Sequence, residues 1–209
     1  CSALRVLYLQ EDIADKMLEM IRGGFDALHV GDPADLATDV GPVIDEDAKA
    51  ALERHIRRCE ASGRTITRLP LPPETAKGCF VAPTIVELGS IRDLAREHFG
   101  PVLHVVRFAA GDLTKVVDDI NAVGYGLTLG LHSRIAETRR LVQARARVGN
   151  FYVNRNQIGA VVESQPFGGE GLSGTGPKAG GPHYLARFAT ERVMTIDTTA
   201  AGGNATLLA

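Results

Sequence analysis

The sequence has 209 residues, of which 44% are apolar and 23% are charged, and its formal net charge is −2. A chain of this length and composition can bury one sizeable core, which excludes an intrinsically disordered protein. No run of Lys or Arg exceeds a pair, which argues against a nucleic-acid partner, and no apolar run approaches the roughly 20 residues that span a bilayer.

The cysteines, Cys1, Cys59 and Cys79, are odd in number and widely spaced, with no C-x-x-C pair. This spacing argues against a disulfide framework and a zinc site, and it favours a reducing cytoplasm. The chain begins at Cys1 without a methionine. Two interpretations stand: an ordinary processed N-terminus, or a cut in a longer protein at the point where its chemistry lies.

The first part of the chain predicts a strand followed by helices. Residues 1–10 hold a strand-like apolar run, and Asp12 has the character of an N-cap for a helix that stops at Gly23. A clearer helix is predicted for residues 45–61, with acids at its start and arginines near its end, as the helix dipole prefers. The apolar repeat of this helix includes His55 and Cys59, so both have a structural explanation as core-face residues.

The middle of the chain alternates between strand and helix patterns. Strands are expected over 102–108, 127–131 and 150–154. A helix capped by Asp112 lies between the first two strands, and a second helix, around 135–142, lies between the last two. Strands that alternate with helices at such short intervals predict right-handed crossovers and a parallel sheet. The expected fold class is therefore α/β, with a parallel sheet flanked by helices.

The pattern changes after about residue 165. Residues 167–181 hold seven of the 23 glycines, and a long loop of this kind is usually functional. A short helix is expected over 183–188, and residues 192–198 alternate like an edge strand. The expected organisation is an α/β domain over 1–165, a glycine-rich loop and short helix of the same domain over 166–188, and an oligomerisation strand with a cut tail over 189–209.

Two generic motifs carry little weight. Gly169, Gly171 and Gly174 satisfy G-x-G-x-x-G, but the dinucleotide fingerprint needs a strand directly before it and a helix opening on the third glycine, and neither is predicted. A cysteine nucleophile with a histidine base is a second possibility, but none of the six histidines is marked as the partner.

Several segments together resemble the aldehyde dehydrogenase superfamily. The residues Glu97-x-Phe99-Gly100-Pro101 match its E-x-F-G-P segment, and residues 165–174 match its P-F-G-G-x-x-x-S-G loop. The similarity covers essentially the whole chain and begins at the family's catalytic cysteine. Residues 173–175 and 180–184 resemble the branch that acts on L-glutamate γ-semialdehyde, which forms from Δ1-pyrroline-5-carboxylate. The tail resembles bacterial bifunctional members that join this enzyme to an FAD-dependent proline dehydrogenase.

The resemblance implies roles for particular residues. Cys1 would be the nucleophile, forming a thiohemiacetal and then a thioester. Glu97 would accept hydrogen bonds from the nicotinamide ribose of NAD+, and Phe99 would support the nicotinamide. In the substrate site, a hydroxyl from Ser2 and backbone N–H groups of Gly180 and Gly181 would bind the substrate carboxylate. Phe188 would pack on the methylene chain of the substrate, and a role as core filler is an equal alternative.

The resemblance also limits what this chain does alone. In the family, the NAD-binding Rossmann domain, the general-base glutamate and the oxyanion asparagine precede the cysteine, so we expect the isolated 209-residue chain to be inactive. A dimer-forming parent enzyme is expected, because the final strand of the family pairs with a partner subunit. Two alternatives stay open: an aldehyde dehydrogenase of different specificity, and a non-catalytic oligomerisation module.

Overall fold

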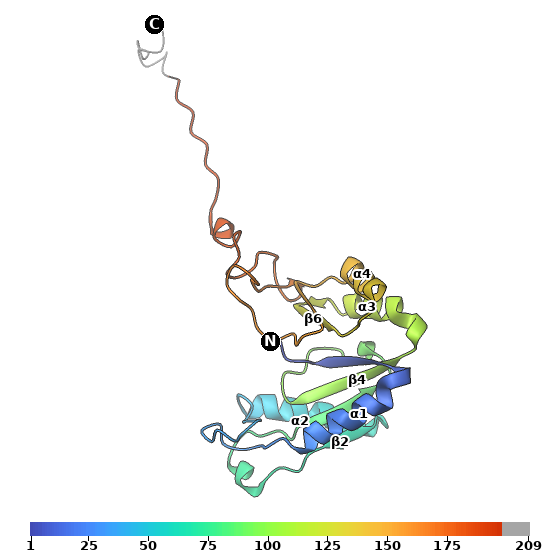
Figure 1. Cartoon of the computed structure of the whole chain (residues 1–209). Coiled ribbons are helices and arrows are strands. Elements are labelled where there is room, and N and C mark those ends of the chain that lie inside the picture. Colours follow the sequence, from blue (N-terminus) through green and yellow to red (C-terminus); the bar gives the residue numbers. More distant parts are fainter. Residues whose placement is uncertain (198–209) are drawn as a thin grey trace. The chain divides into compact units, whose positions relative to one another are not determined.

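The structure, a computed structural model, describes residues 1–197. The chain divides into a first unit, Cys1–Gly159 with Gly168–Gly176, and a second unit, Ala160–Phe167 with Pro177–Ala209. Figure 1 shows the helices and strands, coloured along the sequence. The α-helices are α1 (Glu11–Asp26), α2 (Glu46–Ala61), α3 (Leu113–Ala122) and α4 (Ala136–Arg145); the strands are β1 (Val6–Gln10), β2 (Ile66–Arg68), β3 (Thr84–Leu88), β4 (Val102–Phe108), β5 (Tyr125–Gly126), β6 (Thr128–Leu131), β7 (Asn150–Val153) and β8 (Glu170–Gly171); the 3-10 helices are η1 (Pro73–Lys77), η2 (Ile91–Asp93), η3 (Ala110–Asp112) and η4 (Leu185–Phe188).

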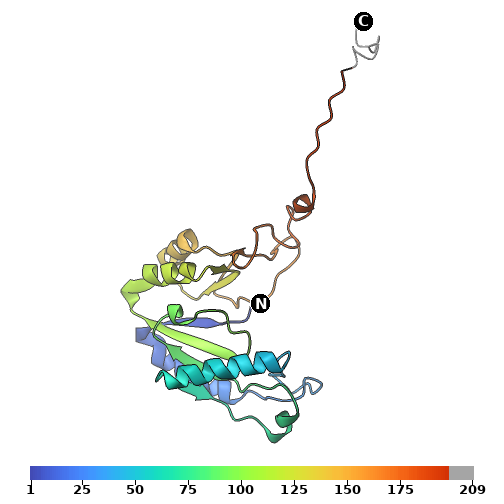
Figure 2. The same cartoon turned by 180° about the vertical axis from the view of Figure 1, so that it is seen from behind.

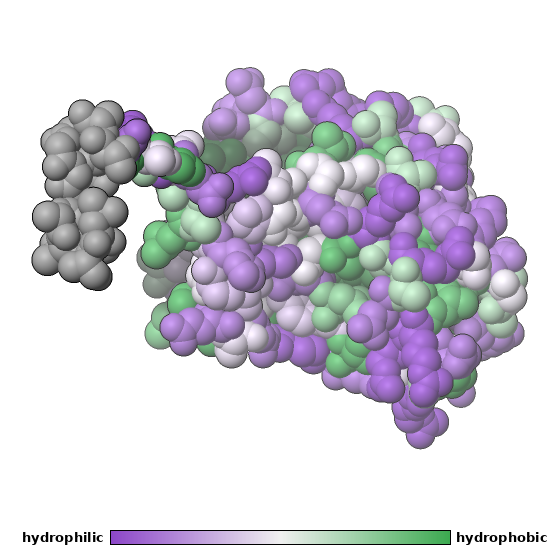
Figure 3. All heavy atoms as spheres, turned by 90° about the horizontal axis from the view of Figure 1, so that it is seen from above, coloured by the Kyte–Doolittle hydropathy of each residue, from purple (hydrophilic) through white to green (hydrophobic). Residues whose placement is uncertain are grey.

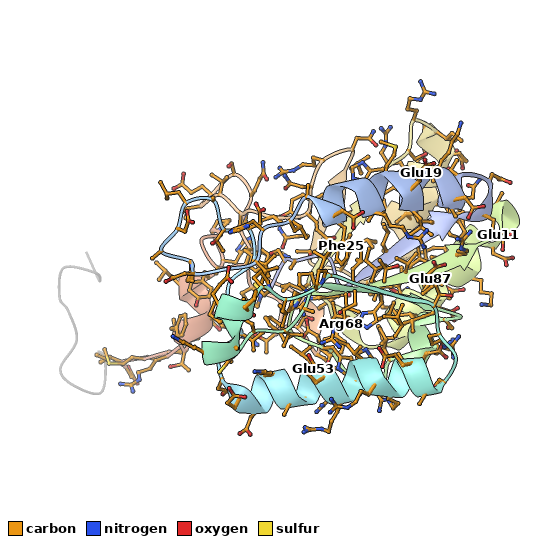
Figure 4. The ribbon with its side chains drawn as sticks, turned by 90° about the horizontal axis from the view of Figure 1, so that it is seen from below. Glu11, Glu19, Phe25, Glu53, Arg68 and Glu87 are labelled. Atoms are coloured by element: carbon orange, nitrogen blue, oxygen red, sulfur yellow. The ribbon has the colours of Figure 1, made fainter. Side chains whose placement is uncertain are left out.

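The main sheet of the first unit has the strand order β1-β4-β3-β2. β4 is central and runs parallel to both β1 and β3, with Val6 opposite His104 and Thr84 opposite Val102, whereas β2 is antiparallel to β3. Helices α1 and α2 cover opposite faces of this sheet (Figure 4). The α/β fold class expected from the sequence is therefore confirmed.

The core consists of two apolar layers, one on each face of the sheet. Alternation along β3 sends Ile85 to the layer under α1 and Val86 to the layer under α2. Both side chains are almost fully buried, at 2% and 0% exposure. At the edge of the α2 layer, Arg68 of β2 pairs with Glu53 of α2 (Figure 4).

Helix α2 matches its predicted bounds closely. The side chain of Asp45 accepts a hydrogen bond from the backbone N–H of Ala48, which caps the helix. His55 and Cys59 are both buried under the sheet, so their predicted place on the core face is confirmed. Figure 2 shows α2 lying across the sheet.

Helix α1 differs from its prediction at both ends. Gln10 rather than Asp12 is the N-cap, and the helix continues through Gly23 and Gly24 to Asp26. Each glycine inside a helix costs about 1 kcal/mol relative to alanine. Phe25 packs against the apolar layer under α1, and this burial offsets the cost of continuing the helix.

The strands expected over 102–108, 127–131 and 150–154 all form, but they do not share one sheet. β6 and β7 pair in parallel with each other, whereas both sides of β4 are already occupied by β1 and β3. The prediction of a single parallel sheet through these strands was therefore wrong. Helices α3 and α4 lie side by side (Figures 1 and 2), joined by the Arg145–Asp118 ion pair at 2.9 Å. Asp112 occupies the N-cap of α3 without a side-chain capping bond.

The rejection of a dinucleotide fingerprint is confirmed for the described residues. Gly171 lies in β8, which pairs antiparallel with β5, and no helix begins at Gly174. Gly171 has φ +62°, and a Cβ there would lie 2.4 Å from the carbonyl oxygen of Gly124. Close backbone packing therefore explains this glycine without a phosphate ligand.

The second unit consists mainly of loops. Phe167 and Ala179 form an isolated antiparallel bridge, and the expected short helix appears as the 3-10 helix η4. No strand forms in residues 189–197, as far as the edge strand predicted over 192–198 is described. The rest of the predicted oligomerisation segment, to residue 209, lies outside the described residues.

The surface carries the polar character expected of an ordinary globular chain. On the face shown in Figure 3, hydrophilic residues predominate and hydrophobic ones are interspersed among them. None of the helices within residues 1–197 combines the length and the apolar character that crossing a membrane requires.

Candidate functional site

The candidate site of the first unit lies where β1 and β4 begin. Strands that run parallel start at the same edge of a sheet, so the segment before β1 and the segment before β4 are neighbours. The first of these segments carries Cys1, which is exposed, and Ser2, which is partly buried. The second segment is Glu97–Pro101. The topology therefore brings the predicted nucleophile and the predicted cofactor residues to one edge of the sheet.

The segment before β4 alternates between exposed and buried side chains. Glu97 and Phe99 are directed outward, with a 35% exposed side chain and a 59% exposed residue respectively, while His98 between them is only 6% exposed. Gly100 packs against α2, because a Cβ at this position would lie 2.3 Å from Cδ1 of Leu52. The buried histidine and the close glycine contact thus anchor the segment, and the carboxylate and the ring stay accessible.

Arg5, which the sequence analysis did not single out, contacts this same segment. Its side chain is 19% exposed. Burial lowers the pKa of the Arg5 guanidinium, and the nearby Glu97 carboxylate opposes that effect by raising it. Arg5 lies four positions after Cys1 and is separated from His98 by 93 positions, so only the fold could bring it to this site.

Three buried histidines lie together at this segment: His55 and His104 are hydrogen-bonded to each other, and His98, which belongs to the segment, stacks on His55. Nε2 of His55 lies 2.8 Å from Nε2 of His104, and Nδ1 of His104 lies 3.1 Å from the carbonyl oxygen of Arg5. The ring of His98 stacks on that of His55 at a centroid distance of 3.5 Å. We refer to His55, His98 and His104 as the histidine cluster.

The partners of the histidine cluster assign its tautomers. Because a carbonyl oxygen only accepts, Nδ1 of His104 donates to Arg5, and its Nε2 must accept from Nε2–H of His55. Nδ1 of His55 is then an acceptor, and the guanidinium of Arg58 lies 3.3 Å away to donate to it. This arrangement satisfies both rings in their neutral form.

Burial favours the neutral form of these rings. Together with smaller contributions from the neighbouring His98 and His104, it lowers the pKa of His55 to about 3. Burial also lowers the pKa of His98 to about 4, with smaller contributions from His104, Arg96 and Arg58. The pKa of His104 is lowered chiefly by burial, and its hydrogen bond to the Arg5 carbonyl raises it. The groups that shift the pKa values of these three histidines include no Asp or Glu. The positive charge of a protonated ring would therefore have little negative charge nearby to balance it.

We expect the histidine cluster to make the chain acid-sensitive. The unfolded state binds protons below pH about 6.5, while the folded-state pKa is about 3 for His55 and about 4 for His98, so the free energy of unfolding falls as the pH is lowered through this window. Between pH 7 and pH 5, the His98 ring alone lowers the free energy of unfolding by about 2 kcal/mol. Urea unfolding of His98→Phe should show a pH dependence smaller by that amount. The exposed His132→Gln should retain the full dependence, and equal stability of the unsubstituted chain at both pH values would contradict this expectation.

In the second unit, Gly180 and Gly181 were expected to offer two backbone N–H donors to the substrate carboxylate, but only one of these N–H groups is free in the part of the chain that the structure describes. Gly180 has φ +74°, and within the described residues its N–H has no acceptor, while its carbonyl oxygen accepts from Glu163 at 2.9 Å. The N–H of Gly181 already donates to the carbonyl oxygen of Lys178 at 2.9 Å. Phe188 is 75% exposed and meets Tyr184 edge to face at 5.3 Å, so it is not a core filler of the described residues.

The remaining thiols and histidines do not form a second centre among residues 1–197, where no group of three or more His, Cys, Asp or Glu side chains is arranged to hold a metal ion. Cys79 donates to the Glu46 carboxylate at 3.2 Å, and this hydrogen bond raises the pKa of its thiol. Burial raises the pKa of Cys59, which keeps that thiol protonated.

Comparison with known proteins adds three similarities. Residues 1–194 match the family model described as "Aldehyde dehydrogenase family". The chain is 56% identical over 197 residues to the bifunctional protein PutA of Klebsiella aerogenes, covering 92% of this chain and 15% of that protein. A crystal structure of a Bradyrhizobium japonicum proline utilization A (PutA) mutant aligns with a TM-score of 0.87 at 56% identity, covering 96% of this chain and 20% of that one.

A second solved structure extends the comparison. The 1-pyrroline-5-carboxylate dehydrogenase from Thermus with bound NAD aligns with a TM-score of 0.77 at 34% identity, covering 90% of this chain and 36% of that one. The chain thus spans between 15% and 36% of the length of these three relatives.

Proposed function

The chain belongs to the aldehyde dehydrogenase family, and from this membership we propose that it is the catalytic part of a longer, NAD+-dependent enzyme that oxidises L-glutamate γ-semialdehyde to L-glutamate in proline catabolism. The observation that carries the proposal is the parallel pairing of β1 with β4, which brings the segment that carries Cys1 and the Glu97–Pro101 segment to one edge of the sheet. The names of the relatives support the choice of substrate.

In the proposed reaction, the thiolate of Cys1 attacks the aldehyde carbon. A C–S bond forms, and the carbonyl π electrons move to oxygen, giving a thiohemiacetal. Loss of the aldehyde hydrogen as hydride leaves a thioester on Cys1. Water then adds to the thioester and the C–S bond breaks, which releases glutamate and the thiol. The exposure of Cys1 leaves its sulfur accessible to a small aldehyde.

The residues present fit the nicotinamide end of NAD+. The Glu97 carboxylate is partly exposed and can accept hydrogen bonds from ribose hydroxyl groups. The Phe99 ring is 59% exposed and lies beside that carboxylate in the chain, which suits it to support a flat aromatic ring. Bound NAD+ would supply the hydride acceptor for the oxidation. The described residues do not show the strand, glycine-rich loop and helix that make up a dinucleotide-binding fingerprint. We therefore propose that the 209-residue chain alone does not oxidise the aldehyde.

The second unit would recognise the substrate's amino-acid end. The N–H of Gly180 is the donor that its loop can offer to a carboxylate, and the carboxylate contact expected of Ser2 stays a prediction. The exposed ring of Phe188 would cover the methylene chain. The N–H of Gly181 already donates to the carbonyl oxygen of Lys178. A substrate carboxylate could accept from this N–H only if that hydrogen bond became bifurcated or broke.

The proposal extends to assembly and compartment. No strand is assigned over residues 189–197, and Val193, Met194 and Ile196 in this segment are 66–90% exposed. These residues would pair with a second copy of the enzyme, giving a homo-oligomer. The longer protein would be cytoplasmic and, if bifunctional like its PutA relatives, would carry a separate FAD-dependent proline dehydrogenase domain.

The test compares two aldehydes on the full-length enzyme. We expect kcat/KM for L-glutamate γ-semialdehyde to exceed that for pentanal, an uncharged aldehyde of the same chain length, by about tenfold to a hundredfold, because a charged hydrogen bond is worth about 1.5–3 kcal/mol. Equal values would support an aldehyde dehydrogenase of other specificity. Oligomerisation without oxidation of either aldehyde would support a non-catalytic module.

A further inference from the structure

We propose that Arg5 is a positioning residue that holds Glu97 and Phe99 in place for the nicotinamide end of NAD+, beside the strand that follows Cys1. The inference rests on the proposed function and assigns a role to a side chain that is neither nucleophile nor direct ligand. Its basis is that the Arg5 guanidinium contacts three consecutive residues of the Glu97–Pro101 segment.

The three contacts differ in kind and together restrain the segment. The Nη1 of Arg5 donates to the carbonyl oxygen of His98 at 2.6 Å. Its Nη2 lies 3.7 Å from Oε1 of Glu97. Its Cζ lies 3.8 Å from the centre of the Phe99 ring, which is a cation–π distance.

These contacts restrain Glu97 and Phe99 without blocking them. The ion pair at 3.7 Å is longer than a hydrogen bond, so the carboxylate is oriented while its oxygens can still accept from a ligand. The guanidinium covers one face of the Phe99 ring, and the residue stays 59% exposed. Arg5 thereby limits the conformations of both side chains before NAD+ binds, which lowers the entropy cost of binding.

Arg5 itself is held by the strand next to it. Its carbonyl oxygen accepts from the backbone N–H of His104 at 3.0 Å and from Nδ1 of the same residue at 3.1 Å. The His98 side chain stacks on His55 on the buried side of the segment. The Glu97–Pro101 segment is thus held on its buried side by the stacking of His98 on His55, and on its exposed side by the Arg5 guanidinium. Arg5 thereby links this segment to β1, the strand that follows Cys1.

The geometry needs a guanidinium. A flat group can lie on an aromatic ring and donate in its own plane at the same time, whereas the ammonium of lysine is a point charge with no plane to stack. Arg5→Lys keeps the charge near Glu97 but cannot make all three contacts at once. Arg5→Met keeps much of the length and removes the charge and the donors.

The test measures NAD+ binding by titration calorimetry on the full-length enzyme. We expect the Kd for NAD+ to rise about tenfold in Arg5→Met, which removes the charge and the donors, and about threefold in Arg5→Lys, which keeps the charge near Glu97. The KM for NAD+ should rise in parallel while the KM for the aldehyde stays within about twofold. Hydrolysis of 4-nitrophenyl acetate, which uses the thiol without NAD+, should also stay within about twofold.

Two controls separate positioning from a general loss of structure. Arg107 is ion-paired to Asp15 at 2.7 Å and to Glu87 at 3.2 Å, at the opposite end of β4, so Arg107→Met should leave the Kd for NAD+ unchanged. In a background that already carries Glu97→Gln, adding Arg5→Met should weaken binding less than about threefold, because part of its effect passes through Glu97.

Each outcome decides the proposal. If Arg5→Met and Arg5→Lys bind NAD+ as tightly as the unsubstituted enzyme, or if the effects of Arg5→Met and Glu97→Gln multiply fully, the positioning role is wrong. If Arg5→Met does not fold, Arg5→Lys with an unchanged melting temperature carries the same test. If the unsubstituted full-length enzyme neither binds NAD+ nor oxidises the aldehyde, the proposed function fails instead.

Discussion

Replacing Cys1 with serine in the full-length enzyme should lower kcat by at least about a thousandfold, because loss of a covalent nucleophile removes the whole thioester route. A serine hydroxyl titrates far above neutral pH, so no comparable anion is available to attack the aldehyde. The Kd for NAD+ should stay within about twofold of the unsubstituted value. NADH formation measures the first quantity and titration calorimetry measures the second.

Cys79→Ser is the matched control for this substitution. The Cys79 thiol donates to Glu46 at the start of α2, and it belongs to none of the segments at the candidate site. We expect its kcat to remain within about twofold of the unsubstituted enzyme. A Cys1→Ser enzyme that kept more than a tenth of the activity would show that another group is the nucleophile.

Gly100→Ala should destabilise the first unit by about 1–3 kcal/mol, the usual cost of overpacking a core. The added Cβ would lie 2.3 Å from Cδ1 of Leu52, with Cδ2 at 3.1 Å and Cγ at 3.3 Å. Leu52 is itself 2% exposed, so it has little room to rotate away. We expect the shift to displace the neighbouring Phe99 and to weaken NAD+ binding as well. Urea unfolding of the chain and calorimetry on the full-length enzyme measure the two effects.

The cause can be tested by changing the other side of the contact. Leu52→Ala alone should cost about 2–5 kcal/mol by leaving a cavity. In that background Gly100→Ala should cost nothing further, because its methyl group enters the vacated space. Gly111→Ala is the matched control, since a Cβ at this position meets nothing within 4 Å. An equal loss of stability at Gly100 and Gly111 would remove the steric explanation.

The sequence by itself was sufficient to predict those elements that depend on interactions between residues close together in the chain. Helix α2 and strand β4 appear with nearly their predicted bounds, because an apolar repeat and an N-cap such as Asp45 act within a few residues. The same kind of rule correctly rejected the dinucleotide fingerprint at Gly169–Gly174. The aldehyde dehydrogenase resemblance, drawn from motifs in order along the chain, is confirmed over residues 1–194.

The failures of prediction lie where a distant partner overrides a local signal. Gly23 and Gly24 carry a local stop signal, but packing of Phe25 against the sheet continues α1 past them. Strand β4 was expected to join the strands that follow it. It pairs instead with β1 and β3, which precede it in the chain, and periodicity alone does not encode which strands pair.

The candidate site divides in the same way. Motif order made Cys1, Glu97 and Phe99 candidates, whereas Arg5 and the histidine cluster were recognised only in three dimensions. Arg5 and His98 are 93 positions apart, and His55 and His104 are 49 apart, so no spacing rule relates them. The sequence alone determined which residues are candidates for the site. The parallel pairing of β1 with β4 decided which of their segments lie at one edge of the sheet, because it places the starts of two strands that are distant in sequence there.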